Sequence, residues 1–396
     1  MSKRILMLGH ANATPQERVM QWALDDGSEI IVLTPEGHIP ILPPSERLIV
    51  ITFPSRWMTL GQRLDNRFVA LPALRTMIEL ISSIFAVDLI HLHWLSDAVL
   101  ALAKAQVKVP KVVSVWGGLN TLVYSIQVKP EEAHGLNLRI DSLSKMDGLI
   151  VEAPLLQQVV EEEFAEVQHV SMIPMGVDTE KFKLTTEVQR RAFIERHRFG
   201  IPPDALTFCS PRGWNVHYRH REVMEAFAEA YSELSDDAWL MFVGLRRGGE
   251  VEELKKYIAD IKQIADNANL SHRVVWIPQR SYDEMPTLFA MTDVVINIPR
   301  TDAFPSTLIE ACACECQIIS ADMATYRGSA LYSHLMRIPP SDPSALKTAI
   351  IEVSKQTREE RRRMGVMARQ MVLDNYDQRR TRSQLMKFYD RLINGH

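Results

Sequence analysis

Cysteine is scarce in this chain, which has four in 396 residues. So few cannot build the disulfide framework of a small secreted domain. Three of them, Cys312, Cys314 and Cys316, fall in one short segment. If that segment is helical, Cys312 and Cys316 share a face and Cys314 points elsewhere, so three thiolates could not easily converge on one metal ion. We therefore expect buried structural thiols.

Long hydrophobic runs and a surplus of basic charge are also lacking. No stretch approaches 18 consecutive apolar residues, and the start, "MSKRILMLGHANATPQ", has too short an apolar run for a signal peptide. We therefore expect a cytoplasmic protein. The formal net charge is −4 and 24% of the residues are charged, which leaves no excess of lysine and arginine to hold nucleic acid.

The chain is longer than one hydrophobic core usually serves, so two domains are expected. Short apolar runs such as "RILMLG" and "LTFCS" alternate with helical periodicity through both halves, and this alternation predicts parallel sheets with crossover helices. The polar stretch from 170 to 192 interrupts the pattern and predicts a linker. The expected parts are an N-terminal domain (1–175), a linker (176–192), a C-terminal domain (193–375) and a last helix (376–396) that packs back on the N-terminal domain.

Four stretches carry a resemblance to a known family. They are "ILMLGHA" with the helix that follows it, "IPMGVDTEKF", "SPRGWNVHYRHREVMEAFAEAY" and "DAFPSTLIEACACECQIISAD". Together they resemble the retaining glycosyltransferases of the GT-B type, group 1 or family 4-like, which transfer sugars from nucleotide donors. The resemblance implies an α/β fold of two Rossmann-like, doubly wound domains that face a central cleft. Open parallel sheets bind ligands at the carboxyl ends of their strands, which agrees with a ligand shared by two such sheets.

The chain departs from the family pattern at four positions. The first of two spaced acids is Asp302 where glutamate is usual, and Pro305 and Glu315 each replace a glycine. In the N-terminal half, Trp116 takes the place of a histidine. These differences keep the identity of the substrate open.

Breaking the bond between a sugar and a nucleotide diphosphate builds negative charge on the leaving phosphate, which fixed cations and helix N-termini stabilise. Arg212 follows the apolar run "LTFCS", which predicts a place at the carboxyl end of a strand. The resemblance implies that Arg212 and Arg219 grip the diphosphate and that Asp302 contacts the sugar. The alternative is that the arginines of "PRGWNVHYRHR", Arg221 included, lie in a solvated loop.

The segment "DAFPST" predicts a turn and "TLIEACA" a helix, so Ser306 or Thr307 could cap that helix and leave backbone N–H groups open to an anion. Glu310 would then lie on the first turn and could accept both ribose hydroxyls. The resemblance adds Phe304 and Gly9 to the donor-binding residues. The alternative is that Glu310 only complements the helix dipole and Asp302 is a surface acid.

The acceptor side has weaker signals. Gly9 lacks a Cβ, so the backbone there could approach a diphosphate or an acceptor closely, and His10 follows it. His93 shares a strand face with His91, and the strand end that holds Trp116 is followed by Gly117. Neither histidine pair has a third ligand for zinc, and no Asp-x-Asp clamp is present in a suitable loop. We therefore expect no metal, with arginine neutralising the diphosphate.

The resulting hypothesis is transfer of a hexose or N-acetylhexosamine, from a UDP-sugar first and a GDP-sugar next, to a glycan or lipid-linked acceptor in cell-surface polysaccharide or glycolipid synthesis. A nucleotide-sugar epimerase of the same fold and a non-catalytic glycan- or nucleotide-binding partner of another transferase stay open as alternatives. The stretch 54–85 mixes arginines with Trp57 and leucines, as an interfacial helix does, so contact with the inner face of a membrane is a further expectation beside a core-facing stripe. The oligomeric state is left open.

Overall fold

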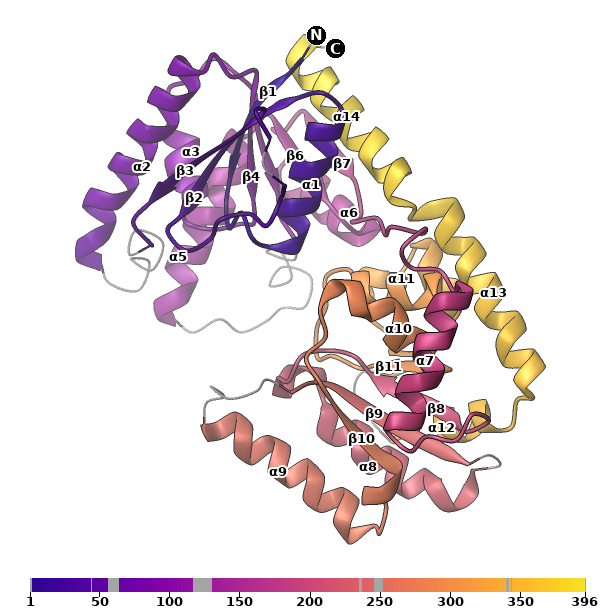
Figure 1. Ribbon diagram of the computed structural model, residues 1–396. Helices are drawn as coiled ribbons and strands as arrows, with labels where there is room; N and C mark the ends of the chain where they lie inside the picture. Colours follow the sequence, from indigo (N-terminus) through magenta and orange to yellow (C-terminus); the bar gives the residue numbers. More distant parts are fainter. Residues whose placement is uncertain are drawn as a thin grey trace. The chain divides into compact units, whose positions relative to one another are not determined.

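The structure is a computed structural model that describes residues 2–43, 45–55, 64–116, 130–234, 237–245, 252–339, 342 and 344–395. The chain divides into two compact units (Figure 1). The N-terminal unit comprises Met1–Met175 with Arg380–His396, and the C-terminal unit comprises Gly176–Arg379. Each unit is built around its own parallel sheet.

The N-terminal sheet has seven strands in the order β3-β2-β1-β4-β5-β6-β7. Every neighbouring pair is parallel. From β1 the strands follow the chain outward to β3 on one side, and from β4 to β7 on the other, so the reversal point of the sheet lies between β1 and β4. The strands are β1 (Arg4–Leu8), β2 (Glu29–Pro35), β3 (Leu48–Phe53), β4 (Leu89–His93), β5 (Lys111–Ser114), β6 (Gly148–Val151) and β7 (His169–Met172).

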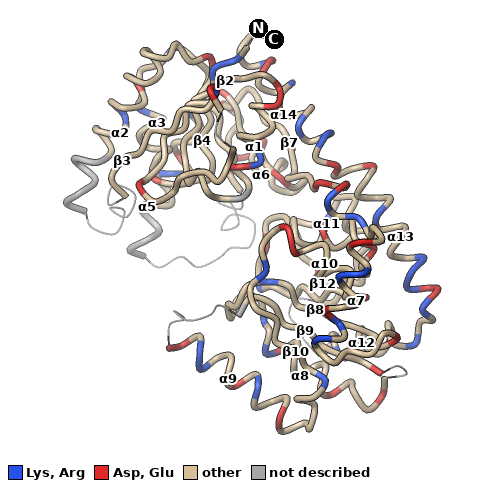
Figure 2. The backbone as a smooth tube through the Cα atoms, in the orientation of Figure 1, with Lys and Arg blue, Asp and Glu red and all other residues tan. Residues whose placement is uncertain are grey.

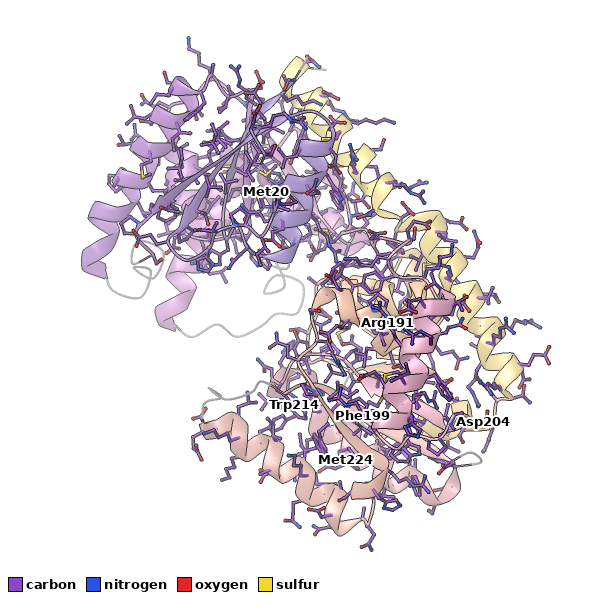
Figure 3. All side chains as sticks on the ribbon, in the orientation of Figure 1. Met20, Arg191, Phe199, Asp204, Trp214 and Met224 are labelled. Carbon is purple, nitrogen blue, oxygen red and sulfur yellow. The ribbon has the colours of Figure 1, made fainter. Side chains whose placement is uncertain are left out.

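The central strands of this sheet carry apolar side chains on both faces, so helices cover the sheet. The helices are α1 (Thr14–Asp25), α2 (Leu64–Ile84), α3 (Ala98–Lys104), α5 (Pro130–Asp141), α6 (Pro154–Glu163) and α14 (Gln378–Asn394). Met20 of α1, which Figure 3 labels, shares one core with Phe388 of α14 and Ile5 of β1. Gly148 makes room there, since a Cβ at this position would lie 2.9 Å from the Phe388 ring. The end of the chain thus completes the N-terminal unit.

The C-terminal sheet has six strands in the order β10-β9-β8-β11-β12-β13, again all parallel. Here the order reverses between β8 and β11. The strands are β8 (Leu206–Ser210), β9 (Ala238–Leu245), β10 (Val274–Pro278), β11 (Val294–Asn297), β12 (Gln317–Ala321) and β13 (Leu335–Ile338).

The helices of this unit form two layers. The α8–α9–α12 group packs together on one side, and the remaining helices include the contacting pairs α7–α10 and α11–α13. Charged residues gather on helices such as α9 and α13, whereas β8, β9 and β10 carry none (Figure 2). The helices are α7 (Thr186–Arg198), α8 (His220–Ala230), α9 (Glu252–Asn267), α10 (Met285–Ala290), α11 (Ser306–Ala313), α12 (Ala345–Ser354) and α13 (Arg358–Asn375).

The predicted fold class of two doubly wound α/β units is confirmed, but the predicted linker is too long. Residues 170–172 lie in β7, and α7 already begins at Thr186. Thr185 caps this helix, since its hydroxyl oxygen accepts a hydrogen bond from the backbone amide of Val188. The helix was missed because it has no continuous apolar face: Ala192 is its only buried residue, and Phe193 and Ile194 are exposed among charged residues. Among the helices that the structure describes, none is both long and apolar enough to cross a membrane.

Candidate functional site

Arg212 and Asp302 lie at the point where the C-terminal sheet reverses its strand order. Arg212 comes two residues after β8, and Asp302 comes five residues after β11, the strand that pairs with β8. Both therefore extend from the carboxyl ends of adjacent parallel strands. This is where open α/β sheets bind their ligands.

The two side chains form an ion pair. Arg212 Nη1 donates to Asp302 Oδ2 at 3.2 Å, and the side chains are only 16% and 13% exposed. Arg212 Nη2 donates to the hydroxyl of Tyr218 at 2.8 Å, and the guanidinium carbon lies 4.3 Å from the centroid of the Tyr218 ring. Burial alone would lower the pKa of Arg212, but the charges of Asp302 and Tyr218 outweigh burial and raise it. The site thus holds a permanent, oriented cation.

Asp302 is fastened at several atoms. Its Oδ2 accepts from the hydroxyl of Tyr326 at 2.8 Å as well as from Arg212, and its Oδ1 accepts from the Ala303 amide at 3.0 Å. Its backbone carbonyl accepts from the hydroxyl of Thr325 at 2.8 Å. Tyr326 was not predicted as a site residue, and no local sequence pattern could have indicated it, because it lies 24 residues from Asp302.

The loop that carries Arg212 rests on a buried histidine. Nδ1 of His220 lies 3.0 Å from Ser210 Oγ, and its Nε2 lies 3.3 Å from the Gly213 carbonyl oxygen. Burial lowers the pKa of His220 to about 4, so the ring is neutral near pH 7. The ring of Trp214, whose side chain Figure 3 labels, lies 4.6 Å from that of His220 between centroids. His220 thus ties both ends of the turn after β8 to the start of α8.

The two other arginines of this loop differ in environment. Arg219 occupies the junction between a short 3₁₀ helix (Val216–Tyr218) and α8, where its φ of 55° is left-handed. Arg221 is 52% exposed and pairs with Glu225 at 2.9 Å on the surface of α8. The solvated-loop interpretation therefore describes Arg221, while Arg212 is the arginine that the sheet presents with Asp302.

The predicted capping of α11 is wrong. The N-cap residue is Pro305, and no side chain caps the helix, since Ser306 is already its first residue. Glu310 is consequently the fifth residue and lies on the second turn, not the first. Glu310 is 7% exposed, so its carboxylate is buried on the second turn of the helix that follows the Asp302 loop. Thr307 also lies inside the first turn.

Phe304, in the turn between Asp302 and α11, packs against two other aromatic side chains. Its ring centroid lies 6.5 Å from that of Tyr326, edge to face, and 5.6 Å from that of Tyr376. Such edge-to-face contacts are favourable beyond their buried area. Phe304 thus anchors the turn between Asp302 and α11.

The cysteines are buried, as predicted, but not all lie on a helix. α11 ends at Ala313, so Cys314 caps it and Cys316 precedes β12. All four thiols are free and buried, and burial raises the pKa of Cys312 to about 12. Within the described part of the chain, no group of three or more histidine, cysteine and acidic side chains could hold a metal ion.

The N-terminal sheet presents Gly9 and His93 at its own reversal point. Gly9 follows β1, and His93 ends the adjacent β4. Gly9 has φ 140°, and a Cβ there would lie 2.5 Å from Gln16 Oε1 and 3.0 Å from the His93 carbonyl oxygen. A side chain here would displace the end of Gln16 and crowd the His93 carbonyl oxygen, in a backbone conformation that favours glycine.

The histidines of β4 share one face but have different surroundings. Nδ1 of His91 lies 2.5 Å from the hydroxyl of Tyr389 in α14, and its Nε2 lies 2.8 Å from Ser114 Oγ, so His91 is a core residue. His93 stacks on Trp116 with centroids 6.5 Å apart, and burial lowers its pKa to about 3. Neither ring nitrogen of His93, nor the indole nitrogen of Trp116, has a hydrogen-bond partner among the described residues.

The remaining acceptor-side residues add little geometry. The ring of His10 stacks on that of His38 with centroids 4.2 Å apart, and burial, followed by the charge of His38, lowers its pKa. Gly117 lies outside the described residues, as does Trp57 in the predicted interfacial stretch.

Comparison with known proteins agrees with this geometry. The family model of the "glycosyl transferases group 1" matches residues 194–371. Sucrose-phosphate synthase from Thermosynechococcus elongatus superposes with a TM-score of 0.79 at 15% identity, over 100% of both chains. HepE from Anabaena, solved with UDP and glucose, gives 0.71 at 14% identity over 98% of this chain and 100% of its own.

A third solved structure, α,α-trehalose 6-phosphate synthase from Burkholderia multivorans, gives a TM-score of 0.74 at 13% identity over 100% of both chains. No curated protein sequence matches the chain significantly. The predicted GT-B fold is thus confirmed, and the resemblance to the group 1 family is supported over residues 194–371. The chain has the GT-B fold, and its C-terminal unit, which holds the ion pair at the carboxyl ends of β8 and β11, contains the stretch that is similar to the group 1 glycosyltransferases.

Proposed function

We propose that this protein is a retaining glycosyltransferase that moves a hexose or N-acetylhexosamine from a nucleotide sugar to a glycan or lipid-linked acceptor. The observation that carries the proposal is the buried ion pair of Arg212 and Asp302 at the reversal point of a sheet in a group 1 transferase unit. A cation and an acid at the carboxyl ends of adjacent strands suit a nucleotide-sugar donor, whose diphosphate is anionic and whose sugar carries hydroxyl groups.

The donor's diphosphate would be held by Arg212 with help from Arg219. A rigid guanidinium that is already desolvated and oriented stabilises charge on a leaving phosphate without reorganising during the reaction. The uncapped N-terminus of α11, with the backbone N–H groups of Ser306 and Thr307, adds positive potential. Glu310 is assigned to the ribose hydroxyls, and Asp302 and Phe304 to the sugar end.

The reaction proceeds by displacement on the face that the nucleotide leaves. The acceptor oxygen forms a bond to the anomeric carbon as the bond from that carbon to the phosphate oxygen breaks. The acceptor's proton passes to the departing phosphate, so no protein nucleophile is needed. Because Arg212 supplies the positive charge at the leaving group, we assign no metal to this step.

The acceptor would approach Gly9, His10, His93 and Trp116 at the ends of strands of the N-terminal sheet, and we keep Gly117 as a candidate because it follows Trp116 in the sequence. His93 and Trp116 support this assignment because their ring nitrogens are buried without partners in the described structure. Buried polar groups of this kind gain most from a ligand that hydrogen-bonds to them. Gly9 directly follows β1 and His93 ends β4, and these two strands flank the reversal point.

A lipid-linked acceptor is supported by α2. Leu80 and Ile84 lie one helical turn apart and are 55% and 72% exposed, so they form an apolar surface strip. The four free thiols suit a reducing compartment, and we assign the activity to the cytoplasm, at the inner face of the membrane where the acceptor requires it.

UDP-sugars are the first donors to test, because HepE is solved with UDP-glucose. GDP-sugars are the second choice. A ligand that binds only the folded state raises the unfolding temperature, so a thermal-shift screen of UDP-, GDP- and ADP-sugars identifies the nucleotide. The best donor is then incubated with protein, and release of free nucleoside diphosphate is measured with and without glycan acceptors. Release supports the transferase, a changed sugar without release indicates an epimerase, and binding without either indicates a non-catalytic partner.

A further inference from the structure

Tyr326 contacts Asp302 from a different part of the fold. It ends a short 3₁₀ helix (Ala324–Tyr326) after β12, and its side chain is fully buried. Its hydroxyl donates to Asp302 Oδ2 at 2.8 Å and accepts from Asn297 Nδ2 at 3.3 Å. Asn297 is the last residue of β11 and is itself 2% exposed. The hydroxyl therefore links the end of the strand to the acid that follows it.

The same 3₁₀ helix also holds the backbone of Asp302. The hydroxyl of Thr325 donates to the carbonyl oxygen of Asp302 at 2.8 Å. Two adjacent residues thus fasten two ends of Asp302, its backbone and its carboxylate. Because the Tyr326 hydroxyl is shielded from water, loss of this bond would leave the acid without an equivalent solvent partner.

The space around the carboxylate is limited by these contacts. Asp302 Oδ2 already has Arg212 Nη1 at 3.2 Å and the Tyr326 hydroxyl at 2.8 Å. One more methylene would extend the acid by roughly 1.5 Å, the length of a carbon–carbon bond. A glutamate at this position would therefore meet the hydroxyl of Tyr326.

We propose that Tyr326 is a positioning residue, which orients the carboxylate of Asp302 toward the donor sugar and occupies the space that a longer acid would need. This inference rests on the proposed transferase function, in which Asp302 contacts the sugar. Tyr326 acts through Asp302 and does not itself touch the donor. The two residues are matched: the tyrosine hydroxyl leaves room for aspartate but not for glutamate, and aspartate is short enough to accept its hydrogen bond.

The test is a double-mutant cycle on donor turnover. Tyr326→Phe removes only the hydroxyl, and we expect kcat to fall roughly 10- to 100-fold, the effect of one hydrogen bond to a charged group. Affinity for free nucleoside diphosphate should not change, because Tyr326 contacts the sugar-side acid. Asp302→Glu alone should also lose activity. In Asp302→Glu/Tyr326→Phe the longer acid has room, so the double variant should be more active than the product of the two single effects.

A matched control is Tyr332→Phe, which removes a tyrosine hydroxyl that donates to a different carboxylate, Asp322, at 2.9 Å in the same unit. It should keep wild-type kcat. If Tyr326→Phe folds poorly by thermal unfolding, Asn297→Ala replaces it; that change frees the hydroxyl from its second partner and should lower kcat by a smaller factor. Unchanged kcat in that variant would overturn the proposal.

The outcomes separate this inference from the function on which it rests. No turnover of any nucleotide sugar by the wild-type protein would overturn the transferase and the role of Tyr326 in it together. Wild-type turnover with an unaffected Tyr326→Phe variant would overturn the positioning role alone. Multiplicative effects in the double variant would show that the hydroxyl does not limit the length of the acid.

Discussion

The carbonyl oxygen of Glu315 occupies the place where a side chain at Gly365 would begin. An ideal Cβ on Gly365 would overlap that oxygen and lie only 2.8 Å from the carbonyl carbon. Gly365 is in the middle of α13, and Glu315 follows α11 with a left-handed φ of 62°. α13 thus packs its backbone directly on the loop that ends the helix bearing Glu310.

Gly365→Ala is expected to destabilise the protein even though alanine favours helices. The added methyl group must push α13 off the backbone of Glu315, and overpacking of this kind costs typically 1–3 kcal/mol of unfolding free energy. Urea unfolding measures the change. Val366→Ala, at a position 48% exposed on the same helix, is the control and should shift stability much less.

Glu315→Gly, at the other residue of this contact, is expected to raise the unfolding free energy instead of lowering it. Residues with a Cβ adopt a left-handed φ at a cost, so glycine should raise the unfolding free energy by about 0.5–1 kcal/mol. A lower stability in this variant would mean that the glutamate side chain contributes more than its backbone strain costs.

Arg212→Lys tests the leaving-group assignment. Lysine keeps the charge but loses the fork that contacts Asp302 and Tyr218 together. We expect kcat to fall roughly 10²- to 10³-fold, the size of removing one oriented donor to developing charge, with Arg212→Ala at least as impaired. The control is Arg198→Ala, whose side chain is 68% exposed, and which should keep full turnover. Wild-type kcat in Arg212→Ala would remove Arg212 from the mechanism.

Glu310→Gln should weaken nucleotide binding more than it slows the chemical step. A contact to ribose persists after the sugar has left, so affinity for free nucleoside diphosphate should fall roughly 10-fold or more, as for a hydrogen bond to a charged group. Isothermal titration calorimetry measures this directly. Glu225→Gln, on the surface of α8, serves as the matched exposed control. Equal nucleotide affinity in Glu310→Gln and the wild type would assign Glu310 to the fold.

Removing divalent metal should leave turnover intact. The charge on the leaving phosphate is assigned to Arg212 and the N-terminus of α11, so donor turnover after dialysis against EDTA should match the untreated protein. Turnover that disappears in EDTA and returns with Mg²⁺ or Mn²⁺ would instead identify a metal as the partner of the diphosphate.

Stability should fall on mild acidification because three histidines are buried in neutral form. Burial lowers the pKa of His93 to about 3 and of His220 to about 4, and it lowers that of His91 as well. The unfolded chain, with histidine pKa near 6.5, then binds more protons than the folded one. The contribution of these histidines to the unfolding free energy is therefore constant above about pH 6.5 and decreases as pH falls from there toward about 4.

Each buried histidine contributes a slope of up to about 1.4 kcal/mol per pH unit across that window. Urea unfolding between pH 7 and 4.5 measures the total slope. His220→Asn keeps a polar atom near Ser210 and removes one titrating group, so it should reduce the slope by up to about 1.4 kcal/mol per pH unit. An unchanged slope would mean that His220 is protonated in the folded protein.

The parts of the fold that were predictable are those in which local pattern and burial agree. Strands such as β8 are buried on both faces, so they are continuous apolar runs that stand out in the sequence. β13 (Leu335–Ile338) was missed because it is short, lies at the sheet edge and includes Arg337. The start of α11 was misplaced because Ser306 and Thr307 are common capping residues, whereas the chain uses Pro305.

The sequence by itself determined most of the order of strands and helices, the class of fold and the presence of an arginine after one apolar run and two spaced acids after another. These follow from periodicity and from which residue types end apolar runs. The tertiary structure decided which of those groups meet. Arg212 and Asp302 are 90 residues apart and come together only because β8 and β11 are neighbours at the reversal point of the sheet. Tyr326 reaches Asp302 only because β12 lies beside β11, and such through-space neighbours leave no periodic trace in the chain.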